Sequence, residues 1–148
     1  MSDLKLAEII PLFPLHGTIL LPGSVLPLHI FETRYRQMVE HVLENDEMMI
    51  GIIQPETMDS KKLCDIGCAG KITTFEETKD RRYVIILVGI IRFRIMEEIE
   101  NQKLYRECSV NFDEFSNDLE ENNEEIKFSD LELIFKNLKS LFMNEGYV

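Results

Sequence analysis

Cysteine and histidine are the side chains most able to do chemistry in this chain of 148 residues. They share no repeated short spacing along the sequence: Cys64, Cys68, Cys108, His16, His29 and His41. Structural zinc usually needs two short-spaced ligand pairs, and only the first two cysteines form one. We therefore expect no metal and thiols that are mostly buried. An odd number of unpatterned cysteines also indicates free thiols in a reducing compartment, so we expect a cytoplasmic protein.

A phosphate-binding loop is suggested by Gly70 and Lys71 in "DIGCAGKITT". Such a loop needs glycine at its first position and Ser or Thr after the lysine, and here Asp65 and Ile72 stand there. The serines form neither a G-x-S-x-G nor an S-x-x-K pattern. We therefore expect no cofactor, no catalytic residues and no enzyme activity. A hydrolase that pairs His16 or His29 with a cysteine is kept as an alternative.

Arginine gathers around "RFR", residues 92–94, and a basic stripe with an aromatic is typical of single-stranded RNA binding. The other members, on predicted neighbouring strands, are Arg81, Arg82 and Arg106. The formal net charge of −11, from 16 basic and 27 acidic residues, excludes DNA and disfavours RNA. We expect Arg92 and Arg94 to pair with the acids of "FEET", and RNA binding stays an alternative.

The elements that must position these side chains begin with an apolar run, residues 9–39, which holds four of the five prolines. Proline at these intervals defeats a membrane-spanning helix, and the start of the chain is a poor signal peptide. The run predicts short extended pieces in edge or crossing strands, because proline in sheets is confined to such places. Five apolar residues exceed what these strands can obviously hide, and we expect them to contact polypeptides: Leu12, Phe13, Leu20, Leu21 and Leu26.

Beyond this run, periodicity predicts an amphipathic helix over 32–43, with Phe31, Tyr35, Met38, Val39 and Val42 on its apolar face. A buried strand is expected at 48–54, and a hairpin at 71–78 and 83–95 with a bulge at Gly89. A third strand is expected at 104–112. This bent meander predicts a small barrel or half-barrel.

The composition changes after residue 112. Residues 113–125 hold seven acids and predict a solvated linker. Residues 126–148 predict an amphipathic helix that begins with a capping box at Ser129 and Glu132. We thus divide the chain into a domain over 1–112, the linker, and this helix, whose apolar face could support self-association.

Two stretches resemble one family. "PLFPLHGTILLPGSVLPLHIFETRYRQMV" and "VGIIRFRIMEEI" are similar to the N-terminal substrate-recognition domain of Lon-type ATP-dependent proteases. The residues that match its pattern are Pro11, Pro14, Pro22, Gly23, Pro27, Phe31, Glu32, Arg34, Tyr35, Gly89, Arg92, Phe93 and Arg94. Thr33 departs from it, since the family often has proline there.

The resemblance implies a mixed α+β, mainly β fold, a PUA-like pseudo-barrel closed by one helix. An abbreviated C-terminal helical segment would follow. It also implies a non-catalytic module for unfolded polypeptides or a protein partner, which could be an ATP-dependent protease, in proteolysis or protein quality control. The chain would be a stand-alone member of the family or a fragment of one.

Overall fold

The computed structural model describes residues 6–58 and 60–121. Its strands are β1 (Ile9–Pro14), β2 (Val25–Ile30), β3 (Met49–Ile53), β4 (Ile66–Glu77), β5 (Tyr83–Ile99) and β6 (Glu107–Asn111). Its helices are α1 (Thr33–Leu43), the 3-10 turn η1 (Asp113–Phe115) and α2 (Asn117–Glu121). The predicted helix, buried strand and hairpin are confirmed, whereas the third strand begins later than expected, at Glu107.

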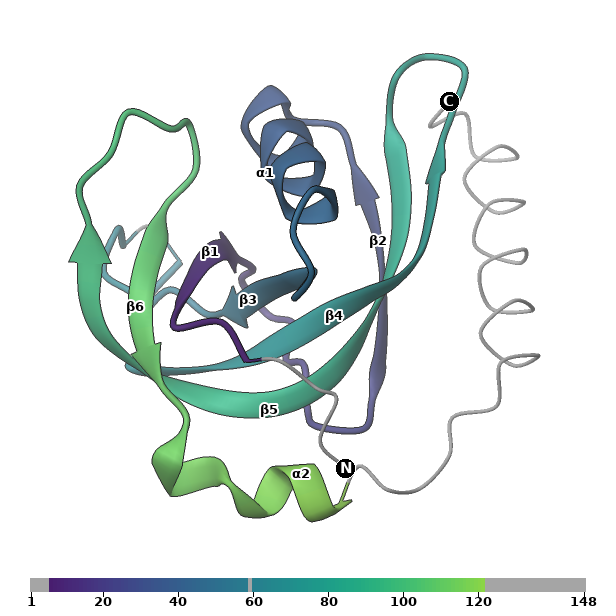
Figure 1. Cartoon of the computed structure of the whole chain (residues 1–148). Helices are drawn as coiled ribbons and strands as arrows, with labels where there is room; N and C mark the ends of the chain where they lie inside the picture. The colour runs from purple at the N-terminus through teal and green to yellow at the C-terminus, as the bar shows by residue number, and fades with distance from the viewer. Residues whose placement is uncertain (1–5, 59, 122–148) are drawn as a thin grey trace.

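All six strands belong to one sheet in the order β2-β5-β4-β3-β1-β6, and β5 pairs with β6 as well. This last pairing closes the sheet into a ring and leaves β2 outside it (Figure 1). The expected mainly β fold with one accompanying helix is confirmed. No helix in the described ranges is long and apolar enough to cross a membrane.

The proline-bearing strands lie where proline is tolerated. β2 is the end strand of the order and pairs with β5 alone, so Pro27 stands on an edge. β1 crosses between two neighbours, because Ile9–Pro11 pair antiparallel with β6 and Leu12–Pro14 pair parallel with β3. The prediction of edge or crossing strands is therefore confirmed.

A bulge bends the long strand β5 in its middle. Gly70 pairs with Gly89 and Ala69 pairs with Ile91, so Ile90 is the extra residue. The bulge predicted at Gly89 is thus confirmed. The bend lets the first half of β5 pair with β2 and the second half with β6, which closes the ring.

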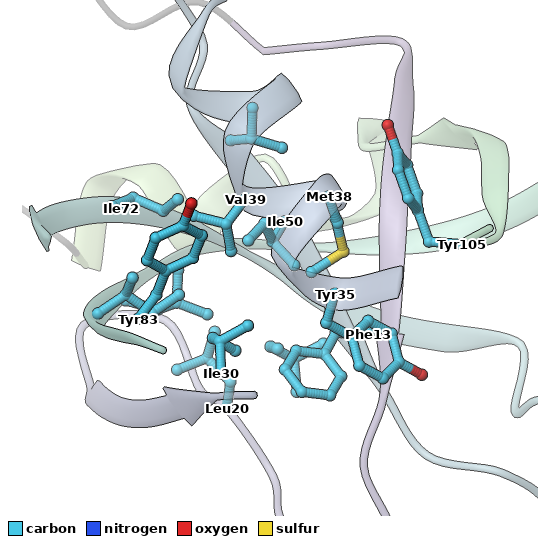
Figure 2. Close-up of a cluster of buried hydrophobic side chains, with 14 of the residues drawn as sticks. Phe13, Leu20, Ile30, Tyr35, Met38, Val39, Ile50, Ile72, Tyr83 and Tyr105 are labelled. Carbon is cyan, nitrogen blue, oxygen red and sulfur yellow. The ribbon is translucent and has the colours of Figure 1, made fainter. Parts of the chain in front are cut away.

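The core consists of two main clusters. α1 covers the first with the face that periodicity predicted, and Met38 and Val39 are fully buried there (Figure 2). Phe13 of β1 stacks on Tyr35 of α1 with ring centroids 4.2 Å apart. Phe31 was wrongly assigned to the buried face, because it precedes the helix and is 59% exposed. The second cluster lies among β1, β3, β5 and β6 and includes Phe115 of η1.

The acidic segment after β6 differs from expectation. Residues 113–121 fold as η1 and α2 and pack on β5, with Phe115 and Asp118 buried. The prediction of a solvated linker is wrong for these residues, because their carboxylates pair with arginines of β5. The predicted helix over 126–148 lies outside the described residues, and the division into three segments stays a prediction.

Candidate functional site

The five apolar residues predicted to bind polypeptides have different surroundings. Leu12, Phe13 and Leu20 are buried in the core, and Leu26 is half-buried against it, so none of these four offers a free side chain. Leu21 alone is well exposed, at 57%. Ile19, which the sequence analysis did not single out, is 69% exposed. The exposure of Ile19 could have been predicted from the strand-like alternation in "TILL", which places Ile19 and Leu21 on the side opposite Leu20.

These exposed residues sit on a loop, residues 18–21, that is hydrogen-bonded at both ends. The side-chain amide of Gln54 donates to the Thr18 carbonyl at 3.2 Å. The Ser24 hydroxyl accepts from the Leu21 amide at 3.0 Å and donates to the Leu21 carbonyl at 2.7 Å. The loop therefore holds Ile19 and Leu21 outward without support from a ligand.

Gly89 anchors the loop to β5. Its carbonyl accepts from the Gly23 amide at 2.8 Å, and its own amide donates to the Ser24 carbonyl at 2.9 Å. A Cβ at this position would lie 2.1 Å from the Leu21 carbonyl oxygen, so only glycine permits the approach. The buried Leu20 side chain fills the space next to Gly70 and Gly89.

An apolar groove of about 190 Å³ lies between this loop, the end of β3 and the start of β4. Exposed Ile19, Leu21 and Ile66 line it together with buried residues of the core. Its complete lining is Thr18, Ile19, Leu20, Leu21, Ile52, Ile53, Gln54, Cys64, Ile66, Gly67, Cys68 and Arg92. Arg92 is the one charged residue among these. The arrangement can accept apolar side chains and offers no acid or base for catalysis.

Arg92 is held in place by the segment that follows β6. The buried Asp118 carboxylate accepts from the Arg92 amide at 3.0 Å, from Nε at 3.0 Å and from Nη2 at 2.9 Å. These hydrogen bonds keep the pKa of Asp118 below its ordinary value, so it stays ionised at neutral pH. The guanidinium also lies 4.8 Å from the centroid of the Phe115 ring.

The predicted partners of the "RFR" arginines were wrong. Arg92 pairs with Asp118 and Arg94 with Glu114, because the strand register places both arginines opposite 66–68 and away from "FEET". The other arginines of the predicted stripe that form ion pairs are Arg82, with Asp80, and Arg106, with Glu98. These four guanidinium groups are thus neutralised within the fold, and nothing in the described residues favours the RNA alternative.

Two of the three thiols, those of Cys68 and Cys108, are poorly suited to act as nucleophiles. Burial raises the pKa of Cys68 to about 12 and that of Cys108 to about 11, whereas a nucleophile needs a lowered pKa. His41 contacts the Tyr105 hydroxyl, His29 lies on β2 and His16 lies in an exposed turn. In the part of the chain that the structure describes, no three His, Cys, Asp or Glu side chains are placed to hold a metal.

A ring-closed, mainly β fold with an apolar groove defines a small binding domain. Residues 9–145 match the model of the ATP-dependent protease La (LON) substrate-binding domain, and the chain belongs to this family. The resemblance seen in the sequence is confirmed. The matched model describes a substrate-binding domain and not a catalytic one.

Relatives and solved structures agree with this assignment. Lon protease 2 of Sorangium cellulosum is 27% identical to this chain, and the match covers 60% of this chain and 12% of the relative. The Lon protease of Syntrophus aciditrophicus is 26% identical, and the match covers 66% of this chain and 13% of the relative. The chain thus spans about an eighth of their length. A Lon N-terminal domain protein from Xanthomonas campestris is 28% identical, with a TM-score of 0.59 over 70% of this chain and 59% of that one. The N-terminal domain of a Mycobacterium avium complex Lon protease shares the fold, with a TM-score of 0.58 and 16% identity. The match covers 70% of this chain and 54% of that one.

Proposed function

We propose that this protein binds exposed apolar segments of unfolded polypeptides in the groove beside the loop 18–21. One observation carries this proposal: Ile19 and Leu21 are held outward, next to an apolar groove, by a loop with hydrogen bonds at both ends. A surface that is already ordered loses little conformational entropy on binding, so its apolar area contributes more of its free energy to affinity.

The size and charge of the groove favour a polypeptide over a small molecule. Its volume of about 190 Å³ is below the roughly 300–1,000 Å³ of typical small-molecule pockets. It has room for one or two apolar side chains of a longer ligand. Since Asp118 neutralises Arg92, the groove offers no free charge to a ligand and selects for apolar side chains.

We further propose that the bound polypeptide is passed to an ATP-dependent protease of the Lon type. The family match supports this, and so do relatives that are Lon proteases about eight times longer than the matched region. The protease would lie on the same chain or on a partner. We place this function in the cytoplasm, where the free thiols Cys64, Cys68 and Cys108 would stay reduced.

Binding of a reduced, carboxymethylated model protein, followed by fluorescence anisotropy, tests the groove. Because Leu21 is exposed, Leu21→Asp should leave the fold intact. Losing the contact of one leucine, worth roughly 1.5–3 kcal/mol, should weaken binding about tenfold or more. Met96→Asp is the matched control, since Met96 is 61% exposed and lies outside the groove. Equal affinities for the two variants would refute the proposal.

A further inference from the structure

A second concavity, of about 560 Å³, lies on the other side of the segment 54–64. Gln54 and Cys64 line the apolar groove, whereas their neighbours Pro55 and Leu63 line this second cleft and pair with each other through a β-bridge. The two concavities are therefore back to back. The first turn of α1 and the loop between β5 and β6, at the left in Figure 1, complete the cleft.

The lining of the cleft combines apolar and positively charged residues. Leu12, Leu63 and Leu104 are its large aliphatic members, and its cations are Arg34, Lys61 and Arg106, against a single acid, Glu98. This local excess of positive charge contrasts with the formal net charge of −11 for the chain. Arg106 is paired with Glu98 and Arg34 with Glu32, so among the described residues Lys61 supplies the positive charge of the cleft that has no acidic partner and can attract an anionic group.

Arg106 and Arg34 have different roles in the cleft. Arg106 donates through Nε and Nη2 to Glu98 at 3.0 and 2.6 Å and through Nη1 to the Lys61 carbonyl at 2.9 Å. Its hydrogen-bonding groups are thus occupied, and it fixes the wall of the cleft. Arg34 uses only Nε, for an exposed contact with Glu32 at 3.1 Å, so its terminal nitrogens have no partner within the described residues.

The start of α1 adds further donors. Glu32 occupies the N-cap position without a side-chain cap, and the first turn holds no acidic residue. The amides of Tyr35 and Arg36 already donate to the Glu32 carbonyl, so it is the helix dipole that favours an anion there. The guanidinium of Arg34 lies 4.8 Å from the centroid of the Tyr35 ring, and burial raises the pKa of Tyr35, so its hydroxyl remains a donor.

We propose that this cleft binds the C-terminal residue of a polypeptide, with the carboxylate at Arg34 and Lys61 and an apolar side chain against Leu63 and Leu104. A chain end carries a carboxylate and a side chain on one carbon, which matches cations placed beside an aliphatic wall. The volume of about 560 Å³ accommodates a short terminal segment. This inference deepens the proposed function, because it names polypeptides with apolar C-terminal residues as one class of ligand.

The test uses two fluorescent peptides of one sequence that end in leucine, one with a free C-terminal carboxylate and one with an amide. We expect the free acid to bind at least tenfold more tightly. The double variant Arg34→Gln/Lys61→Gln should abolish this difference, and Lys79→Gln, in the turn between β4 and β5, should preserve it. Circular dichroism verifies folding, which the exposed positions 34 and 61 should not disturb.

Each other outcome has a defined meaning. Equal affinity for acid and amide, or displacement of the acid peptide by inorganic phosphate more readily than by N-acetyl-leucine, would overturn the inference. If binding of the unfolded model protein still depends on Leu21 in that case, the proposed function stands. If instead the difference between acid and amide persists while Leu21→Asp has no effect on the model protein, the cleft is supported and the groove is refuted.

Discussion

Gly89→Ala should displace the loop that forms one wall of the apolar groove. The added Cβ would lie 2.1 Å from the Leu21 carbonyl oxygen, 2.9 Å from its carbonyl carbon and 3.2 Å from Leu20 Cγ. Carbon and oxygen atoms normally approach no closer than about 3.3 Å, so the loop must move by roughly 1 Å or more. The backbone of Leu21 cannot rotate away as a flexible side chain could.

The expected cost follows from the contacts that this movement disturbs. The two hydrogen bonds that join Gly89 to Gly23 and Ser24 are each worth about 1 kcal/mol net, and overpacking next to buried Leu20 costs about 1–3 kcal/mol. We expect a loss of roughly 3–5 kcal/mol in the free energy of unfolding and a melting temperature lower by about 6–20 °C. Binding of the unfolded model protein should weaken about tenfold, because Ile19 and Leu21 lose their fixed positions.

Urea denaturation followed by circular dichroism measures the stability, since the chain has no tryptophan. Gly17→Ala is the matched control: Gly17 has a φ of +79°, but a Cβ there would meet no atom within 4 Å. It should cost about 1–2 kcal/mol through backbone conformation alone and should leave binding unchanged. If Gly89→Ala is no less stable than this control and binds equally well, the role assigned to the loop is wrong.

Two further predictions concern the ion pair at Arg92 and the thiols. Asp118→Ala should cost about 2–3 kcal/mol at neutral pH, because it removes a buried acceptor of three hydrogen bonds while half-exposed Arg92 can be rehydrated. The pKa of Asp118 is lower in the folded chain than in the unfolded one. The difference in stability between the native protein and Asp118→Ala should therefore be constant above pH 5 and shrink as the pH falls below about 4. Urea denaturation curves of the two proteins that stay equally far apart down to pH 3 would contradict this. In the native protein at pH 8, N-ethylmaleimide should modify half-buried Cys64 before Cys68 and Cys108, whose burial raises their pKa to about 12 and 11. Mass spectrometry that finds Cys68 modified as fast as Cys64 would refute the assigned burial.

Local periodicity was sufficient to predict most elements of the fold. The apolar face of α1 repeats every three to four residues, and β4 and β5 are separated by a polar turn, so both elements follow from neighbouring residues alone. The bulge at Gly89 was predictable because glycine weakens a long β-branched strand. The pairing of β5 with β6 could not be predicted from neighbouring residues, because it joins residues that only the bend in β5 brings together.

The acidic segment 113–121 shows why composition alone was misleading. A run of acids far from any known cation predicts a solvated chain, because isolated buried carboxylates are costly. Here the cations are on β5, about 20 to 26 residues earlier: Arg92 reaches Asp118, and Arg94 reaches Glu114. The basic residues of "RFR" and the acids after β6 thus form ion pairs with each other. From the sequence, Arg92 and Arg94 were expected to pair with "FEET", with RNA binding as an alternative, and the acids after residue 112 were expected to be solvated.

The binding candidates failed for a related reason. They were predicted from a comparison between the number of apolar residues among the prolines and the area that short strands can cover. That comparison missed the interior created when the ring closes and α1 packs beside it, which buries Leu12, Phe13 and Leu20. Only alternation within the loop could distinguish Leu21 from Leu20, and a segment of four residues carries that signal weakly.

The residues that match the family pattern around β5 have structural roles. Gly89 admits the loop 18–21, Arg92 and Arg94 hold α2 and η1, and Phe93 is fully buried beside Gly51 and Gly67, where added Cβ atoms would meet its ring at 3.0 and 2.6 Å. These residues therefore support the walls of the groove, and of the four only Arg92 lines it. The exposed residues at the groove, Ile19, Leu21 and Ile66, are not among the residues that carry the family pattern. Ligand preference should accordingly change when these three are exchanged for other apolar residues, while the stability set by Gly89 and Phe93 should not.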